Sequence, residues 1–272
     1  MTTAFVLGGG GVLGAVEVGM LRALVEAGVR PDLVVGTSVG AVNGAAFAAD
    51  PTGDGVARLG ALWQELSGGE VFGGSVLARA RTVLRTGTSL HSPDPLRALL
   101  EQHLPGPAFA DLLVPFQCVA AQIEQAREHW FHRGALVPAV LASCAVPGLF
   151  PPVEIDGQHY LDGGLVHSIP VGRAVQLGAG TVYVLQVGRI ERDLVAPTRP
   201  WQVATVAFEV VRRHRFAADL AELPDGVTVH VLPTGDTAPG LREDLRYRDT
   251  ARVGARVQSA YAASAAYLAR QG

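Results

Sequence analysis

The stretch that most constrains this chain is a short apolar strand that runs directly into a Gly-x-Ser-x-Gly turn. Residues 34–44 read Val-Val-Gly-Thr-Ser-Val-Gly-Ala-Val-Asn-Gly. This pattern is typical of a nucleophile elbow, in which a sharp turn lifts a serine hydroxyl, here that of Ser38, above the end of a sheet. We expect glycine at positions 36 and 40 because neighbouring backbone passes close to a strained turn. The helix that begins near Val39 then directs its N-terminal N–H groups at the reaction centre.

The chain upstream of the elbow predicts a neighbouring strand and a glycine-rich loop. Residues 3–7 are typical of a buried strand, residues 8–14 form the loop, and a helical pattern over 15–27 ends at Gly28. Such a strand–helix–strand unit joins parallel strands by a right-handed crossover, and parallel neighbours end at the same sheet edge. We therefore expect the glycine loop to lie beside Ser38. Its consecutive N–H groups can point at one oxygen atom, as an oxyanion hole requires.

Composition and charge exclude several classes of protein. The 272 residues are 49% apolar and 17% charged, which excludes a disordered chain and suits one large domain. The net charge of −3 gives no general attraction to nucleic acid. Lysine is absent, so a Walker lysine, a Schiff-base lysine and a Ser–Lys dyad are excluded. Cys118 and Cys144 lie in apolar surroundings without metal-ligand spacing, and we expect two buried thiols and neither a disulfide nor a metal.

The N-terminus and the hydropathy pattern predict a soluble, cytoplasmic protein. The N-terminus has no basic leader, and the first predicted strand stands where a signal peptide would be. Glu17, Asn43 and many glycines interrupt every apolar run before it reaches 18 residues. We expect any membrane contact to be peripheral. The basic run at residues 212–215 is interpreted as a solvated helix face, with anionic lipid headgroups as the alternative.

The rest of the chain predicts strands that alternate with helices. This alternation is typical of a three-layer α/β/α sandwich around a mostly parallel sheet. We expect one domain over residues 1–272, with a cap or lid at 68–106, where Gly and Pro are frequent. A loop at 50–55 is expected after the elbow helix. The expected helices cover 39–49, 63–66 and its flanks, 95–104, 136–145, 171–177, 201–220 and 249–270, and the expected strands cover 115–123, 128–133, 153–161, 181–187 and 227–232.

A serine hydroxyl needs a base at neutral pH, and histidine is the first type to consider. In an α/β-hydrolase the chain order of serine, acid and histidine leaves His167, His214 or His230 as the base. That fold has several strands before its elbow, whereas only one precedes Ser38 here. Only His167 has an acidic residue closely upstream, so a histidine triad is the weaker interpretation.

Asp162 is the stronger candidate for the base. It stands at the end of a hairpin strand, directly before Gly163 and Gly164, which leave room for close approach. A carboxylate within hydrogen-bond reach of Ser38 accepts its proton directly once burial raises the carboxylate pKa. The same Asp-Gly dipeptide six residues earlier is interpreted as a hairpin turn alone.

Three motifs therefore stand in order: the glycine loop, Gly-x-Ser-x-Gly, and a late Asp-Gly-Gly. In this order the chain resembles the patatin-like phospholipases, which are lipid acyl hydrolases with a Ser–Asp dyad. The segment 142–152 is also similar to the family's segment before its aspartate, so the resemblance covers nearly the whole chain. It implies Ser38 as the nucleophile and Asp162 as the base. It also implies a lipid or carboxylic-ester substrate, an acyl-serine intermediate, and no metal or cofactor.

The resemblance further implies an oxyanion hole from backbone N–H groups of the glycine loop and the elbow. Its members would be Gly9, Gly10, Gly11 and Val39. The supporting glycines of the three motifs are Gly14, Gly36, Gly40, Gly163 and Gly164.

Two residues depart from the family pattern. The family usually has Arg or Lys where this chain has Leu13, and the missing cation can weaken binding of phosphate-bearing substrates or the anchoring of the loop. The family often has Asn where this chain has His167. We interpret His167 as an ordinary loop residue, with hydrogen bonding to the aspartate loop as the alternative. A lipid or carboxylic-ester hydrolase is thus better supported than a phospholipase.

Three other functions are compatible with parts of the sequence. The loop also matches the Gly-x-Gly-x-x-Gly dinucleotide fingerprint, but the second strand lacks the acidic residue that would bind ribose, since Asp32 is at its other end. A catalytically degenerate lipid-binding module would not need to retain Ser38 and Asp162. An acyltransferase would pass the same acyl group to an alcohol instead of water, and the sequence does not separate this reaction from hydrolysis.

Overall fold

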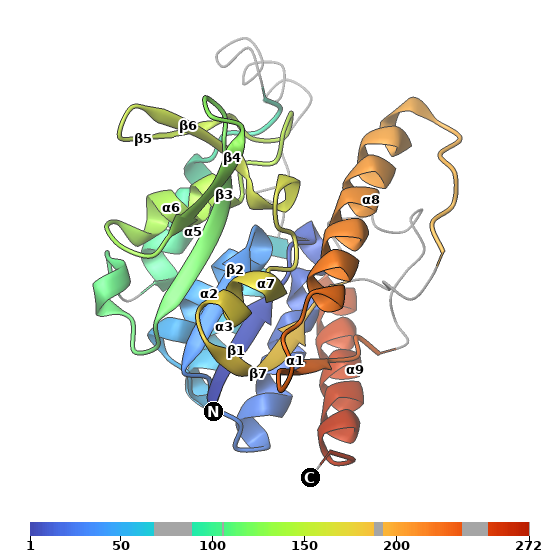
Figure 1. Ribbon diagram of the computed structural model, residues 1–272. Coiled ribbons are helices and arrows are strands. Elements are labelled where there is room, and N and C mark those ends of the chain that lie inside the picture. Colours follow the sequence, from blue (N-terminus) through green and yellow to red (C-terminus); the bar gives the residue numbers. More distant parts are fainter. Residues whose placement is uncertain (68–88, 105, 188–192, 236–249, 272) are drawn as a thin grey trace.

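The computed structural model describes residues 1–67, 89–104, 106–187, 193–235 and 250–271 (Figure 1). A central sheet lies between helices on both of its faces, so the predicted mixed α/β architecture is confirmed. Within the described residues, no helix combines the length and the apolar character that crossing a bilayer requires.

Eight strands of the described chain form one sheet. Strands β1, β2, β3, β7 and β8 are parallel neighbours, whereas β4 and β6 run antiparallel to β3. The order is β5-β6-β3-β2-β1-β7-β8, with β4 also on β3. The bounds are β1 Thr2–Leu7, β2 Leu33–Thr37, β3 Phe116–Gln122, β4 Arg127–Phe131, β5 Val153–Ile155, β6 Gln158–Asp162, β7 Ala179–Leu185 and β8 Thr228–Val231.

The helices agree with the predicted ones to within a few residues at most ends. They are α1 Ala15–Glu26, α2 Val39–Ala49, α3 Gly53–Ser67, α5 Asp94–His103, α6 Leu136–Ser143, α7 Val171–Gln176, α8 Pro200–Ala221 and α9 Thr250–Leu268, with short 3-10 turns η1 Gly11–Gly14, η2 Phe109–Asp111 and η3 Gly163–Leu165. The predicted loop at 50–55 is wrong at its end, because α3 already begins at Gly53. The hydroxyl of Thr52 accepts the N–H of Gly55 at 3.2 Å and caps this helix.

Of the expected cap at 68–106, residues 68–88 and 105 lie outside the described part of the chain. The described part contains α5, whose Leu96 and Leu100 are buried in the main apolar core.

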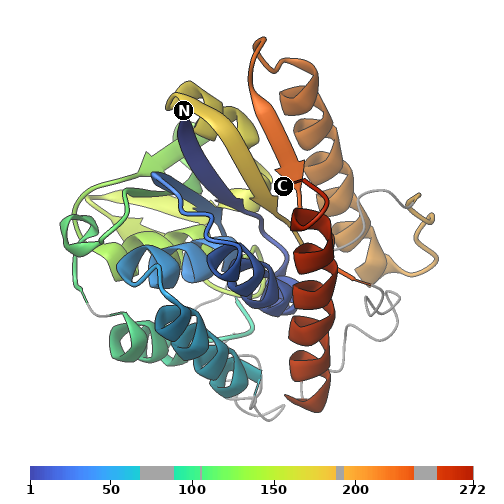
Figure 2. The same cartoon turned by 90° about the horizontal axis from the view of Figure 1, so that it is seen from below.

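Alternate side chains of the central strands enter two separate cores. Phe5 and Leu7 of β1 point to the larger core, which α1, α2, α3 and α9 cover. Ala4 and Val6 point to the smaller core, which α7 and α8 cover. Figure 2 shows this division, with α1, α3 and α9 together on one side of the sheet. The period of two is what a strand buried on both faces requires.

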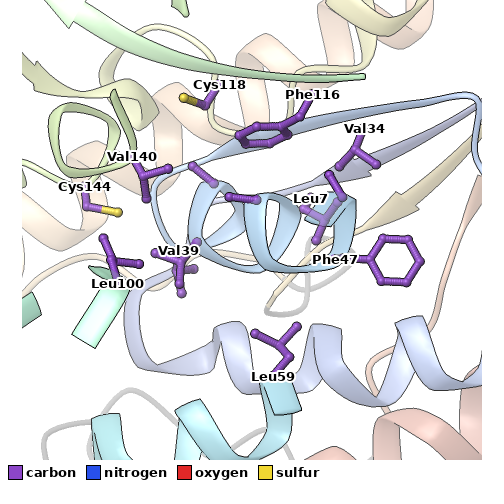
Figure 3. Close-up of a cluster of buried hydrophobic side chains, with 14 of the residues drawn as sticks. Leu7, Val34, Val39, Phe47, Leu59, Leu100, Phe116, Cys118, Val140 and Cys144 are labelled. Atoms are coloured by element: carbon purple, nitrogen blue, oxygen red, sulfur yellow. The ribbon is translucent and has the colours of Figure 1, made fainter. Parts of the chain in front are cut away.

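Helix α2, which follows the elbow, is almost completely buried within the larger core (Figure 3). Phe47 stacks on Phe5 with ring centroids 5.8 Å apart, and Leu59 of α3 belongs to the same core. Glycine and alanine make up much of α2, which lets the sheet approach it closely. The residue at the start of this helix, Ser38, is therefore held on a rigid support.

Candidate active site

Ser38 occupies the turn between β2 and α2 that the sequence predicts. Its backbone has φ 54° and ψ −124°, a conformation that L-residues rarely adopt and that is typical of strained functional turns. A Cβ at Gly36 would lie 2.3 Å from the carbonyl oxygen of Gly40, and a Cβ at Gly40 would lie 2.3 Å from that of Leu7. Both glycines are therefore needed for close backbone approach, as expected.

Strand β3 brings the elbow and the aspartate together. Thr37, which precedes Ser38, pairs with Val119, and Asp162 pairs with the next residue of β3, Ala120. Strand β4 pairs with β3 over both positions and so occupies the opposite edge. Strand β6 therefore continues along the edge of β3 at the point where β2 ends. Consecutive residues of one strand thus fix the places of Ser38 and Asp162.

Ser38 and Asp162 form a direct hydrogen bond. The Ser38 hydroxyl donates to Oδ2 of Asp162 at 2.6 Å, and Oδ1 accepts the N–H of Gly164 at 2.7 Å. Asp162 is only 1% exposed. Burial raises the pKa of this carboxyl to about 6, against the lowering effect of the hydrogen bonds from Ser38 and Gly164. At neutral pH the carboxylate is thus ionised yet basic enough to accept a proton.

The end of α6 supports both members of this pair. The hydroxyl of Ser143 accepts the N–H of Ser38 at 2.9 Å, and the N–H of Asp162 donates to the carbonyl of Ala145 at 2.9 Å. Sequence reasoning did not single out Ser143, although it lies in the segment 142–152 that resembles the family. Cys118 and Cys144 are free and buried, as expected. Burial, and then the charge of Asp162, raise the pKa of the Cys144 thiol, which keeps it protonated.

The glycine loop lies beside the elbow, with Gly9 next to the Cβ of Ser38. The N–H of Gly9 donates to the carbonyl of Ser168 at 2.8 Å, so it is not available to a substrate, which differs from the sequence-based expectation. Gly10 and Gly11 are exposed, and within the described residues their N–H groups have no backbone acceptor. The N–H of Val39, first in α2, also lacks an intrahelical partner.

His167 stabilises the site through its backbone. Its N–H donates to the carbonyl of Gly163 at 2.8 Å, and its carbonyl accepts the hydroxyl of Thr37 at 2.7 Å. The imidazole lies instead against Glu128 and Arg215, where burial lowers its pKa. The backbone of His167 thus joins the elbow to the aspartate loop, whereas its imidazole makes no hydrogen bond to that loop among the described residues.

The other two candidate histidines have different surroundings. His214 is exposed on α8, and Nδ1 of His230 lies 3.1 Å from the hydroxyl of Tyr267. None of the three weighed histidines hydrogen-bonds to Ser38 or Asp162 in the part of the chain that the structure describes.

Two further sequence expectations concern charge near the loop. Arg212 is 3% exposed and donates to Gln186 at 3.0 Å and to the carbonyl of Val187, so the interpretation of residues 212–215 as a solvated face is wrong for this position. Leu13 is partly buried and packs on the larger core. Within the described ranges, no three His, Cys, Asp or Glu side chains cluster in the way a metal site requires.

Comparison with known proteins places this site in a family context. The model of the patatin-like phospholipase family matches residues 5–175. The chain is 32% identical to "Patatin-like phospholipase domain-containing protein 7" of Rattus norvegicus over 197 residues, which are 70% of this chain and 14% of the relative. It is 30% identical to "Lysophospholipase nte1" of Aspergillus terreus over 190 residues, 70% of this chain and 12% of the relative. The matched part of the chain thus spans only 12% to 14% of the length of these relatives.

A solved structure shows the same fold. The structure of VipD from Legionella pneumophila matches 99% of this chain and 67% of its own, with a TM-score of 0.55 and 14% sequence identity. At this identity the likeness concerns the fold alone, a central sheet flanked by helices.

Proposed function

The chain belongs to the patatin-like phospholipase family, and from this premise we propose that it is a serine-dependent lipid acyl hydrolase of the phospholipase A or carboxylic-ester type. One observation carries the proposal: the hydroxyl of Ser38, held on a strained turn, donates at 2.6 Å to the buried carboxylate of Asp162. A serine that is merely structural would not require this turn or this partner.

The first half of the reaction acylates Ser38. Its Oγ attacks the ester carbonyl carbon while its proton passes to Oδ2 of Asp162, and the carbonyl π electrons move to the oxygen. The tetrahedral intermediate then collapses, the carbon–oxygen bond to the leaving alcohol breaks, and that alcohol takes the proton from Asp162. An acyl-serine remains.

The second half releases the acid. Asp162 accepts a proton from water as the water oxygen attacks the acyl-serine carbonyl. Collapse of the second tetrahedral intermediate breaks the bond to Ser38 Oγ, which regains the proton from Asp162. The free carboxylic acid leaves, and the starting hydrogen bond between Ser38 and Asp162 is restored.

We assign the oxyanion hole to the N–H groups of Gly10, Gly11 and Val39. The two glycines belong to the exposed part of the loop, and Val39 is the first residue of α2. The positive end of the α2 dipole lies at the same place and favours the developing negative charge. Gly9 is left out because its N–H is already bonded to Ser168.

The substrate class follows from the family and from one departure. The relatives are named patatin-like phospholipase domain proteins and lysophospholipases, which favours an acyl ester of a lipid. Leu13 contributes an apolar side chain to η1 where the family usually places a cation. We therefore assign a preference for neutral esters over lipids with a charged headgroup.

The test is intact-mass labelling with a fluorophosphonate probe, applied to wild type, Ser38→Ala and Asp162→Asn. We expect one probe mass on wild type, none on Ser38→Ala, and labelling of Asp162→Asn slowed by about 100-fold or more, since this base contributes two to four orders of magnitude. Turnover of a neutral carboxylic ester should fall in parallel, with the free acid as product. A folded wild type that neither labels nor turns over esters would contradict the proposal and favour a lipid-binding module. Transfer of the acyl group to an added alcohol without free acid would favour an acyltransferase.

A further inference from the structure

A buried polar network lies directly beneath the glycine loop. Glu17 of α1 and Asn43 of α2 are both 0% exposed, and Trp63 of α3 is 2% exposed. They are surrounded by the larger apolar core. Buried polar side chains without a role are costly, so their presence under the site calls for a physical reason.

Three hydrogen bonds fix the side chain of Asn43 in one orientation. Its Nδ2 donates to Oε2 of Glu17 at 2.7 Å and to the carbonyl of Gly14 at 3.0 Å, and its Oδ1 accepts Nε1–H of Trp63 at 2.8 Å. Rotating the amide by half a turn would place a donor against the indole N–H and an acceptor against two acceptors. The amide therefore acts as a rigid link between three helices.

The hydrogen bond from Asn43 to Gly14 connects the two elements that supply the proposed oxyanion donors, which are the glycine loop and α2. Gly14 ends the 3-10 turn that begins at Gly11, directly after Gly10, and Asn43 lies one helical turn after Val39 on α2. The loop and the helix also touch here, because a Cβ at Gly14 would lie 2.5 Å from Cγ2 of Val39. The bond from Asn43 to Gly14 thus sets the spacing between the loop and the elbow helix.

The carboxyl of Glu17 holds the Asn43 amide in place. Burial raises the pKa of its carboxyl well above its usual range, although the bond from Asn43 and the charge of Arg212 lower it. Its second oxygen, Oε1, is buried and has no hydrogen-bond partner among the described residues. Asn43 needs only one acceptor oxygen from residue 17, which is Oε2 of Glu17. The amide oxygen of a glutamine at this position can supply that acceptor.

We propose that Asn43, oriented by Glu17, is a positioning residue that holds the N–H groups of the glycine loop and of Val39 at the separation one oxyanion requires. The inference rests on the proposed function, and it gives a role in that function to Asn43 and Glu17, which lie away from the reacting atoms. Asn43 touches no substrate, and its effect passes through Gly14 and α2.

The test compares Asn43→Leu, Glu17→Leu and Glu17→Gln on an ester substrate. Asn43→Leu should lower kcat by about 10- to 100-fold, the loss expected for one misplaced oxyanion donor, with KM within about twofold of wild type. Glu17→Leu, which leaves Asn43 bonded to Gly14 and Trp63, should give a smaller loss. Glu17→Gln keeps an acceptor for Asn43 and should retain most of kcat.

Two readouts separate positioning from a merely structural role. Affinity for an alkyl trifluoromethyl ketone, which forms an oxyanion on Ser38, should fall by the same factor as kcat/KM across the series. The acid limb of the pH profile should stay near pH 6 in every variant, because Asp162 is untouched. Leu24→Ala supplies a matched control, since Leu24 is a buried residue of α1 outside the network. It should lower the unfolding midpoint without changing kcat of the folded fraction.

The inference is overturned if Asn43→Leu, folded by circular dichroism, keeps kcat and ketone affinity within about threefold of the Leu24→Ala control. It is also overturned if Glu17→Gln is as damaging as Asn43→Leu. If Asn43→Leu does not fold, the two Glu17 variants provide the test. A loss of kcat and ketone affinity in Glu17→Leu that is absent in Glu17→Gln supports the inference, and any other result overturns it. Failure of the proposed function is distinct, because wild type itself would then neither label with fluorophosphonate nor bind the ketone.

Discussion

The hydroxyl of Ser38 reaches the carboxylate of Asp162 at 2.6 Å, although 124 residues separate them in the chain. The carboxylate is almost completely buried, and its only described hydrogen bonds come from Ser38 and from the N–H of Gly164. Among the described residues no positive side chain neutralises it, so burial is the main influence on its pKa. Several measurable properties follow from this one environment.

The first is the pH dependence of turnover. The pKa of Asp162 is raised to about 6, and the base must be ionised to accept the proton of Ser38. We expect kcat/KM on a neutral ester to rise as pH increases from 5 to 7, with a single ionisation near pH 6. An acid limb that lies below about pH 4.5, the range of an unperturbed carboxyl, would contradict this assignment.

The second is a stability gain on removing the base. The pKa of Asp162 is higher in the folded state than its usual value of 3.8, so the folded protein binds more protons between these two pH values. Stability therefore falls as pH rises through this window, by about 3 kcal/mol for a shift from 3.8 to about 6. Asp162→Asn has no carboxyl at this position, so its stability does not include this decrease with rising pH. Urea unfolding at pH 4 and pH 8 should show the variant gaining on wild type at the higher pH, and equal pH dependence of the two proteins would refute the assignment.

The third prediction concerns His167. Its imidazole contacts Glu128 and Arg215, whereas only its backbone contacts the elbow and the aspartate loop. His167→Asn should therefore keep at least about a third of wild-type turnover while lowering stability by about 1 kcal/mol, the usual effect of a lost buried contact. Steady-state kinetics and thermal unfolding measure the two effects. A loss of turnover as complete as in Ser38→Ala would mean that the Ser–Asp dyad is incomplete.

The fourth prediction concerns steric room at the oxyanion loop. A Cβ at Gly10 would lie 1.6 Å from Cγ2 of Val187. Gly10→Ala should displace the loop and reduce kcat by about 10-fold or more, since oxyanion donors are sensitive to position. The obstacle is a side-chain methyl group, so adding Val187→Ala should restore part of kcat. Val187→Ala alone is the control, and a double variant no better than Gly10→Ala would show that the loss has another cause.

The fifth prediction addresses Leu13. If the apolar side chain sets the preference for neutral esters, Leu13→Arg should raise kcat/KM for a phospholipid relative to a neutral ester of the same acyl chain. A shift of about fivefold corresponds to roughly 1 kcal/mol of differential binding. Parallel assays on the two substrates measure it, and Leu13→Met serves as the uncharged control. An unchanged ratio would show that position 13 does not contact headgroups.

The sequence predicted those parts of the molecule that depend on local pattern. The strand, the elbow glycines and the helix after Ser38 are encoded within residues 34–44, and the hairpin before Asp162 is encoded by its Asp-Gly turn. These turns are recognisable in the sequence because few residue types tolerate their backbone conformations. Fold class was predictable for the same reason, from alternating strands and helices.

The sequence did not predict features that depend on partners far along the chain. Gly9 loses its role as a donor because the carbonyl of Ser168 lies opposite it, and no local pattern reveals that pairing. Arg212 is buried and its guanidinium donates hydrogen bonds to Gln186 and to the carbonyl of Val187, although the three residues that follow it are all polar. The hydrogen bond between the Ser38 N–H and Ser143 could not be predicted either, because nothing in the sequence around a serine in an apolar helix indicates its partner.

The shared register on β3 has a consequence for how this architecture can change over time. Because Thr37 and Asp162 are seated on adjacent residues of one strand, the catalytic distance is set by hydrogen bonds across the sheet. It does not depend on the length of the chain between α2 and β3. Insertions in that interval can therefore remodel what surrounds the site while the Ser38–Asp162 pair stays intact, whereas a single-residue deletion within β3 would separate the pair. The fold thus separates the part whose geometry must stay fixed from the part that is free to vary.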